Sequence, residues 1–115
     1  MPLHKSETNV HTPLTPAVFH ILLALADGKL HGYAIMRAVE ADTSPSVKMG
    51  PGTIYGSLQR MEEAGLVEDC GSVENGKRRL YRMTPLGRKA LEAESARLAR
   101  LTTMARDKGL VPREI

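Results

Sequence analysis

Residues 66–85 read LVEDCGSVENGKRRLYRMTP, and this stretch decides the fold class of the chain. Two runs that suit β-strands, 67–73 and 78–83, flank a short polar centre. Asn75-Gly76 at that centre is the strongest short-range signal for a two-residue β-hairpin turn. The stretch therefore predicts an antiparallel hairpin.

The turn also predicts which residues of the two strands face each other. If Asn75 and Gly76 form the loop, Asp69 faces Arg82 and Cys70 faces Tyr81. Opposite charges directly across an antiparallel pair are stabilising. We expect this register throughout the hairpin.

The tip of the hairpin is strongly cationic. Three consecutive basic residues follow the turn: Lys77, Arg78 and Arg79. Between residues 77 and 89 there are six basic residues and no acidic one, although the net charge of the whole chain is only +3. Clustered positive charge is typical of proteins that bind a polyanion. The alternative is a solvated face that only aids solubility.

Three helices are predicted upstream of the hairpin. Apolar residues recur at helical spacing over 16–26, 32–41 and 51–64. Gly65 follows the third segment as a left-handed C-cap. A short strand is expected over 47–49.

A longer helix is predicted downstream of the hairpin. Thr84-Pro85 forms a cap-plus-proline start, and the helix should run to about residue 108. Its length of roughly 36 Å exceeds what so small a domain can cover, so we expect a partner helix from a second chain. The expected homodimer contact residues are apolar positions of the first and last helices: Val18, Leu22, Leu91, Leu98, Leu101 and Ala105.

This order of elements is that of a winged helix-turn-helix. The predicted fold class is mainly α with a small β-hairpin wing, in which a winged helix-turn-helix domain is joined to a long C-terminal dimerisation helix. The expected organisation is an N-terminal arm (1–13), a DNA-binding domain (14–84), and a dimerisation helix with its tail (85–115).

The third predicted helix opens on Gly50-Pro51-Gly52 and carries Gly56 inside its first turns, although glycine costs a helix interior about 1 kcal/mol relative to alanine. We interpret these small residues as clearance for DNA, with Ser57 among the outward positions and free amides at the helix start available to a phosphate. The alternative is a polar surface helix. The expected DNA-binding residues combine this helix, the segment before it and the hairpin tip: Lys48, Pro51, Gly52, Thr53, Tyr55, Ser57, Gln59, Arg60, Lys77, Arg78 and Arg79.

Other function classes find little support in the sequence. No Cys/His cluster has zinc-site spacing, and no constellation meets the criteria for an active site, so we expect neither an enzyme nor a cofactor. A metal-responsive winged-helix repressor is an alternative that depends on His4 and His11. The single Cys70, the lack of a signal peptide and the lack of an apolar run long enough for a membrane span predict a cytoplasmic protein with no membrane partner.

Three motifs resemble those of the PadR family of transcriptional regulators: LHGYAIMRAVE (30–40), GPGTIYGSLQRMEEAGLVE (50–68) and ENGKRRLYRMTPLGRKAL (74–91). Gly56 stands where the family often has proline. Because the sequence ends soon after its long helix, it resembles the short members, which dimerise through their first and last helices and usually act as repressors.

The resemblance implies that an inverted-repeat operator in double-stranded DNA is the partner. It also implies release by a small apolar or aromatic effector at the dimer interface. The expected effector lining is Phe19, Leu22, Leu23, Leu98, Leu101 and Met104. The chain has no Trp, which disfavours the drug-stacking mode of some short members. A protein-interaction module that keeps the fold without binding DNA is the other alternative.

Overall fold

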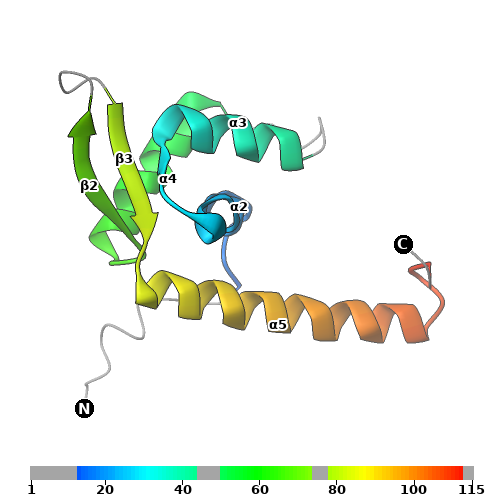
Figure 1. The fold of residues 1–115 in the computed structure, drawn as a ribbon. Helices are drawn as coiled ribbons and strands as arrows, with labels where there is room; N and C mark the ends of the chain where they lie inside the picture. The colour runs from blue at the N-terminus through cyan, green and yellow to red at the C-terminus, as the bar shows by residue number, and fades with distance from the viewer. Residues whose placement is uncertain (1–12, 44–49, 74–77, 113–115) are drawn as a thin grey trace, which may run out of the picture.

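The computed structural model describes residues 13–43, 50–73 and 78–112. Helices α3 and α5 lie on opposite sides of α2, and the β2–β3 hairpin stands at one end of the molecule (Figure 1). The elements, in chain order, are α2 (Pro16–Ala24), the 3₁₀ turn η1 (Leu25–Asp27), β1 (Leu30–His31), α3 (Gly32–Asp42), α4 (Pro51–Glu63), β2 (Val67–Val73), β3 (Arg78–Met83) and α5 (Pro85–Asp107). This arrangement confirms the predicted fold class of a mainly helical chain with a small β-wing.

Threonine caps start two of the helices, as the sequence predicts. The Thr15 hydroxyl accepts a hydrogen bond from the Val18 amide at 3.2 Å. The Thr84 hydroxyl accepts one from the Gly87 amide at 3.0 Å and donates to the Gly65 carbonyl at 2.6 Å. Proline follows each cap, in the first turn where its missing N–H costs nothing. Thr84 thus both starts α5 and ties that start to the end of α4.

The sheet contains one strand that the sequence did not predict. Its order is β1-β3-β2, and β1 pairs with the outer edge of β3, with Leu30 opposite Tyr81. With only two residues, β1 is too short to carry a recognisable alternation of polar and apolar side chains. The strand predicted over 47–49 lies outside the described residues.

The predicted hairpin register holds only near the turn. Val73 faces Arg78 and Ser72 faces Arg79, as expected, but Asp69 faces Tyr81. The predicted pairs Asp69–Arg82 and Cys70–Tyr81 are therefore wrong.

A β-bulge causes this one-residue shift. Cys70 and Gly71 together oppose the single residue Leu80. Gly71 has a φ of +103°, and its amide donates to the Asp69 carboxylate at 2.8 Å. The glycine inside a predicted strand was the available sequence signal for the bulge.

The core forms where α2, α3, α4 and the first turns of α5 meet the sheet. Its buried apolar residues are Ile21, Leu22, Leu25, Ile35, Val39, Ile54, Leu58, Met61, Leu66, Val67, Tyr81, Ala90 and Leu91. Leu22 is fully buried and Leu91 is 6% exposed within a single chain. This corrects their expected places at a dimer contact, and that of Leu22 in an effector site, because both side chains already pack in the core of their own chain.

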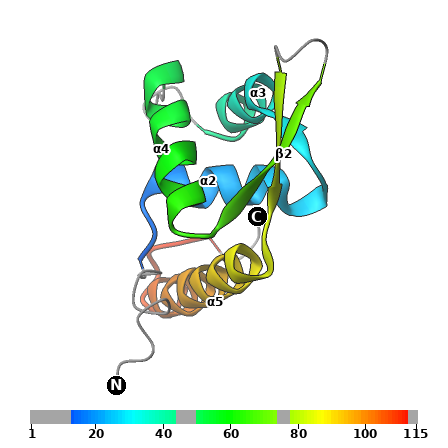
Figure 2. The ribbon, with the colours of Figure 1, turned by 90° about the vertical axis from the view of Figure 1, so that its left-hand side faces the viewer.

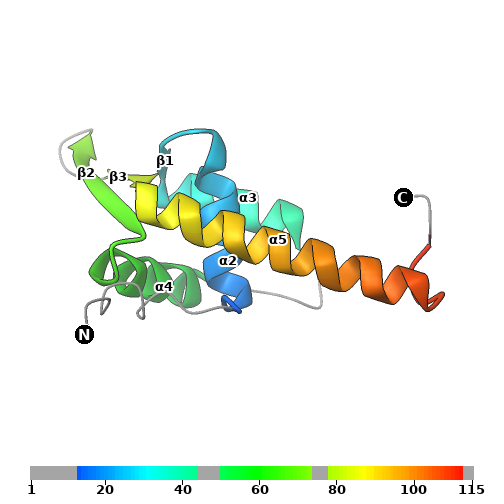
Figure 3. The same ribbon diagram turned by 90° about the horizontal axis from the view of Figure 1, so that it is seen from below.

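The second half of α5 projects past the other helices (Figure 3). Apolar side chains remain exposed there, with Leu98 36%, Leu101 41% and Met104 53% accessible to solvent. Leu23 on α2 is also exposed. These residues leave an apolar surface uncovered in one chain.

Glu94 marks the boundary between the packed and the projecting halves of α5. Its carboxylate is buried and accepts hydrogen bonds from Nε and Nη2 of Arg97 at 2.8 and 2.7 Å. The Arg97 guanidinium, assisted by the backbone N–H of Leu14, lowers the pKa of this carboxyl against the opposing effect of desolvation. Glu94 therefore joins α5 to the segment that leads into α2.

Candidate nucleic-acid interface

The start of α4 is a surface of small residues and unpaired amides. Pro51, Gly52 and Thr53 are exposed. The first hydrogen bond within the helix runs from the Ile54 amide to the Gly50 carbonyl at 3.1 Å. The preceding amides point out of the helix end, where the macrodipole favours an anion. An added Cβ on Gly52 would meet nothing within 4 Å, so the packing of this chain does not require glycine at residue 52.

Tyr55 is held against the N-terminus of α3. A Cβ added to Gly32 would lie only 2.6 Å from Tyr55 Cε1, so the aromatic ring occupies the space that this glycine leaves free. Tyr55 is still 45% exposed. Gly32 thus fixes the position of a side chain on the accessible face of α4.

Ser57 does not point outward, as the sequence predicted. Its side chain is 2% exposed and lies with Ile54, Leu58 and Met61 on the buried face of α4. Its hydroxyl accepts a hydrogen bond from Arg60 Nη2 at 3.4 Å. Ser57 therefore contributes to packing and to the position of Arg60, and its side chain is not available to a partner molecule.

The other exposed residues of α4 are Gln59, Arg60, Glu62 and Glu63. Gly56 lies between them and the helix start, and a Cβ there would meet only Arg60 Nη1, at an ordinary 3.6 Å. Alanine would fit this position in the isolated chain. The packing of the chain itself therefore gives no reason for glycine at residue 56.

The described part of the wing holds two of its cations in ion pairs, Arg79 with Asp69 and Arg82 with Glu68. The Arg79 guanidinium contacts the Asp69 carboxylate, and the Arg79 side chain is 62% exposed. The Gly71 amide, together with Arg79, lowers the pKa of Asp69. Lys48 and Lys77 lie outside the described residues, as does the side chain of Arg78. Of the predicted basic contacts before and within the wing, only Arg79 is placed.

Helix α3 adds two exposed residues that the sequence analysis missed. Tyr33 is 55% exposed, and its hydroxyl accepts a hydrogen bond from Arg37 Nη1 at 3.3 Å. The Arg37 guanidinium carbon lies 5.8 Å from the centre of the Tyr33 ring. Spacing of four residues between an aromatic side chain and an arginine on a helix was the available signal.

The start of α4 and the distal end of the hairpin lie on one side of the molecule. In Figure 2 the N-terminal end of α4 and the adjoining ends of β2 and β3 point to the same edge, and α5 crosses the opposite side. The start of α4 and the distal end of the hairpin can therefore meet one extended partner together.

Two other kinds of site were sought in the described part of the chain. Within it, no group of three His, Cys, Asp or Glu side chains is placed to hold a metal ion. No helix in the same residues is long and apolar enough to cross a membrane.

Residues 21–93 match the family described as transcriptional regulator PadR-like. The chain belongs to this family. The PadR-like chain is 36% identical over 83 residues to the transcriptional regulator Rv3488 of Mycobacterium tuberculosis, a match that covers 71% of this chain and 75% of that protein. It is 45% identical over 82 residues to an uncharacterized 37.1 kDa protein in transposon TN4556 of Streptomyces fradiae, of which the match spans only 23%.

Solved structures share the fold of this PadR-like chain. A PadR family regulator from Clostridium difficile R20291 superposes with a TM-score of 0.70 at 23% identity, covering 79% of this chain and 95% of that one. Bacillus subtilis PadR in complex with operator DNA gives 0.62 at 22% identity, covering 70% and 46%. Bordetella bronchiseptica BpsR, whose DNA binding is regulated by 6-hydroxynicotinic acid, gives 0.67 at 23% identity, covering 96% and 85%.

Proposed function

We propose that this PadR-like regulator binds duplex DNA as a homodimer and represses transcription from an inverted-repeat operator. The observation that carries this proposal is the placement of the α4 N-terminus and the distal end of the hairpin on one side of the molecule. The fold shared with Bacillus subtilis PadR, which was crystallised with operator DNA, supports it. The cytoplasm, predicted from the sequence, belongs to the same proposal.

In this proposal α4 enters the major groove. The amides at its start bind a phosphate, and Tyr55, Gln59 and Arg60 reach base edges or the neighbouring backbone. Gly56 lets the helix backbone approach the groove closely, a role that the open space around it permits. Ser57 is not among the proposed contacts because its side chain is buried.

The wing and α3 contact the DNA phosphate backbone on either side of the major groove. Arg79, whose side chain is 62% exposed, exchanges its half-buried Asp69 partner for a phosphate, and Asp69 keeps its hydrogen bond from the Gly71 amide. Lys48, Lys77 and Arg78 remain proposed phosphate contacts from the sequence. Tyr33 and Arg37 add a hydroxyl and a guanidinium on exposed α3.

The homodimer forms through the exposed apolar surface of α5 and α2. Its proposed contacts are Val18, Leu23, Leu98, Leu101, Met104 and Ala105. Burying this surface against a second copy removes apolar area that a single chain leaves in water. Half-sites are then separated by about one helical turn or a small multiple of it.

Release from DNA by a small molecule completes the proposal, and the regulation of BpsR by 6-hydroxynicotinic acid supports it. The dimer can adopt different spacings of its two α4 helices. A ligand that binds one spacing more tightly than the other changes the affinity of the dimer for the operator by the ratio of these two ligand affinities. Phe19, Leu23, Leu98, Leu101 and Met104 remain candidates for lining such a site between two copies.

A salt titration of operator binding tests the proposal. Fluorescence anisotropy with duplex DNA from upstream of the protein's own gene should show binding that weakens steeply with salt. Replacing Lys77, Arg78 and Arg79 together by Ala should weaken binding to every duplex and flatten the slope of log K against log salt by about 0.9 for each lost phosphate contact. Arg100→Ala, an exposed change on α5, is the matched control.

Two outcomes count against parts of this assignment. If the triple variant keeps the salt slope of the parent, the wing does not contact phosphates. If the parent shows no salt-sensitive duplex binding at micromolar concentration, the fold serves a protein partner instead of DNA.

A further inference from the structure

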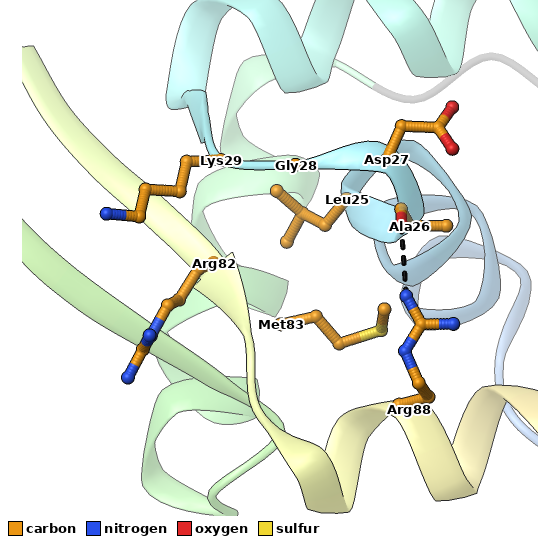
Figure 4. A pocket seen from close by; sticks show the side chains of 8 residues that line it. All are labelled: Leu25, Ala26, Asp27, Gly28, Lys29, Arg82, Met83 and Arg88. Atoms are coloured by element: carbon orange, nitrogen blue, oxygen red, sulfur yellow. Dashed lines mark hydrogen bonds between the residues drawn. The ribbon is translucent and has the colours of Figure 1, made fainter.

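A solvent-open cavity of about 310 Å³ lies where the helix-turn-helix, the wing and α5 meet. This volume is at the lower end of the range for small-molecule sites. Its lining comes from the end of α2 with η1, from the turn into β1, from the end of β3 and from the first turn of α5: Leu25, Ala26, Asp27, Gly28, Lys29, Arg82, Met83 and Arg88 (Figure 4). The η1 turn and the segment leading into β1, which supply much of this lining, lie on the side of the molecule opposite α4 (Figure 3).

The basic side chains around this cavity differ in whether a carboxylate balances their positive charge. Arg82 donates to the Glu68 carboxylate from Nε and Nη2, at 3.1 and 2.9 Å, so its charge is neutralised outside the cavity. Arg88 Nη2 donates to the carbonyl oxygen of Ala26 at 3.0 Å, which satisfies one N–H but leaves the positive charge unbalanced. Within the described residues, no carboxylate is paired with Arg88 or Lys29.

Asp27 does not supply the missing charge. Its side chain points away from Met83 and Arg88 in the close view (Figure 4). A guanidinium has five N–H donors, so Arg88 can keep its bond to Ala26 and still bind an anion with the others. Arg88 is therefore the natural anchor for a carboxylate.

Two larger apolar side chains also belong to the lining, which is otherwise mostly charged or backbone. Leu25 and Met83 lie between Arg88 on one side and Lys29 on the other (Figure 4). Leu25 belongs to the buried core, and Met83 packs against it half-buried. Among the described residues, no aromatic side chain lines the cavity. Leucine and the flexible methionine side chain suit an alkyl chain.

We propose that this cavity binds a small aliphatic carboxylate. The Arg88 guanidinium binds the carboxylate, the alkyl chain lies against Leu25 and Met83, and Lys29 adds attraction from the opposite edge. The site differs from the apolar surface between copies because all of its lining comes from one chain.

Occupation of this site would couple to DNA binding through α5, a consequence that rests on the proposed function. The Arg88–Ala26 hydrogen bond links the first turn of α5 to η1 at the end of α2. A carboxylate bound to Arg88 competes with the Ala26 carbonyl for the guanidinium or changes the orientation of this hydrogen bond. The angle of α5 to the helix-turn-helix, and with it the spacing of two α4 helices in a dimer, is then sensitive to the ligand.

Binding without DNA tests the site directly. Amide NMR titrations of the full chain would use hexanoate, acetate as the anion without a long chain, and 1-hexanol as the neutral chain, all at one ionic strength. Hexanoate should give saturable shifts at Leu25 to Lys29, Met83 and Arg88. Its affinity should exceed that of either partial probe by about tenfold or more, because both charge and apolar burial contribute.

Substitutions locate the charge that matters. Lys29→Gln and Arg88→Gln should each weaken hexanoate binding about fivefold or more, whereas Lys89→Gln, which removes the neighbouring α5 cation outside the cavity, should leave it unchanged. Because Arg88→Gln also removes the bond to Ala26, Lys29→Gln is the variant that keeps the test decisive if the other fails to fold.

Several results would overturn the proposal. The first is that the NMR shifts do not saturate with hexanoate. The second is that acetate, inorganic phosphate or 1-hexanol binds as tightly as hexanoate. The third is that Lys29→Gln and Lys89→Gln change the affinity for hexanoate equally. Operator titrations with and without saturating hexanoate separate the existence of the site from its effect on DNA binding. Binding of hexanoate with unchanged operator affinity keeps the site and removes its regulatory role, whereas failure to bind any duplex refutes the proposed function and leaves the site standing.

Discussion

Replacing Gly87 by alanine should destabilise the fold, although alanine favours a helix. Gly87 is buried in the first turn of α5. A Cβ there would overlap the carbonyl oxygen of Leu66 and come within 3.0 Å of Met83 Cγ and 3.1 Å of the Leu66 carbonyl carbon. Glycine at residue 87 is therefore required by the close approach of α5 to the turn between α4 and β2.

The Leu66 backbone has little freedom to move away. Its carbonyl accepts hydrogen bonds from the Thr84 amide and hydroxyl, each at 3.1 Å, and its amide donates to the Met61 carbonyl at 2.8 Å. Overpacking costs about 1–3 kcal/mol, and a lost hydrogen bond costs about 1 kcal/mol more. The gain in helix propensity from glycine to alanine is only about 1 kcal/mol. The net expectation is a loss of about 1–3 kcal/mol.

Urea unfolding followed by far-UV circular dichroism measures this loss at fixed protein concentration. For a chain of 115 residues, each 1 kcal/mol corresponds to a fall in Tm of about 4 °C. Gly56→Ala is the matched control: its Cβ meets nothing closer than 3.6 Å, so it should be neutral or up to about 1 kcal/mol more stable. A Gly87→Ala variant as stable as the parent would refute the packing argument.

Three further predictions concern separate parts of the molecule. Gly32→Ala should displace the Tyr55 ring, the end of a flexible side chain, and weaken operator affinity in anisotropy titrations with little change in Tm; unchanged affinity would remove Tyr55 from the proposed interface. Asp69→Asn should reduce the loss of folding stability at acid pH. The hydrogen bond from the Gly71 amide and then Arg79 lower the native pKa of Asp69. The stabilising contribution of Asp69 is therefore complete above its ordinary pKa of about 3.9 and is lost as the pH falls through its native pKa. Parallel stability curves of parent and variant below about pH 5 would contradict this. Leu101→Glu should convert a dimer into a monomer of unchanged helicity in size-exclusion chromatography with light scattering, and a persistent dimer would place the contact elsewhere.

Local chemistry explains why much of the fold was predictable from the sequence. The Asn75-Gly76 turn placed both strands of the hairpin, and the observed bounds agree with the prediction. The threonine caps at residues 15 and 84 placed the starts of α2 and α5 correctly. Each of these signals acts within a few residues, so it does not depend on what packs nearby.

The faces of the helices were less predictable. By helical spacing alone, Ser57 falls at the border between the polar and apolar sides of α4, and hydrophobic periodicity cannot decide the orientation of such a residue. Leu22 and Leu91 fit a dimer seam by spacing, but apolar spacing does not distinguish a contact with the same chain from one with a second chain. The structure assigns all three side chains to the interior.

The sequence by itself determined the order of the helices and of the two hairpin strands, the caps that start two of the helices and the family to which the chain is similar. Only the tertiary structure decided the pairing of β1 with β3, the contact of Tyr55 with Gly32 and the cavity beside Arg88. The physical reason is that the first set arises from hydrogen bonds and conformations between near neighbours. The second set depends on how residues distant in the sequence divide a limited space, as Leu66 and Gly87 do across the start of α5.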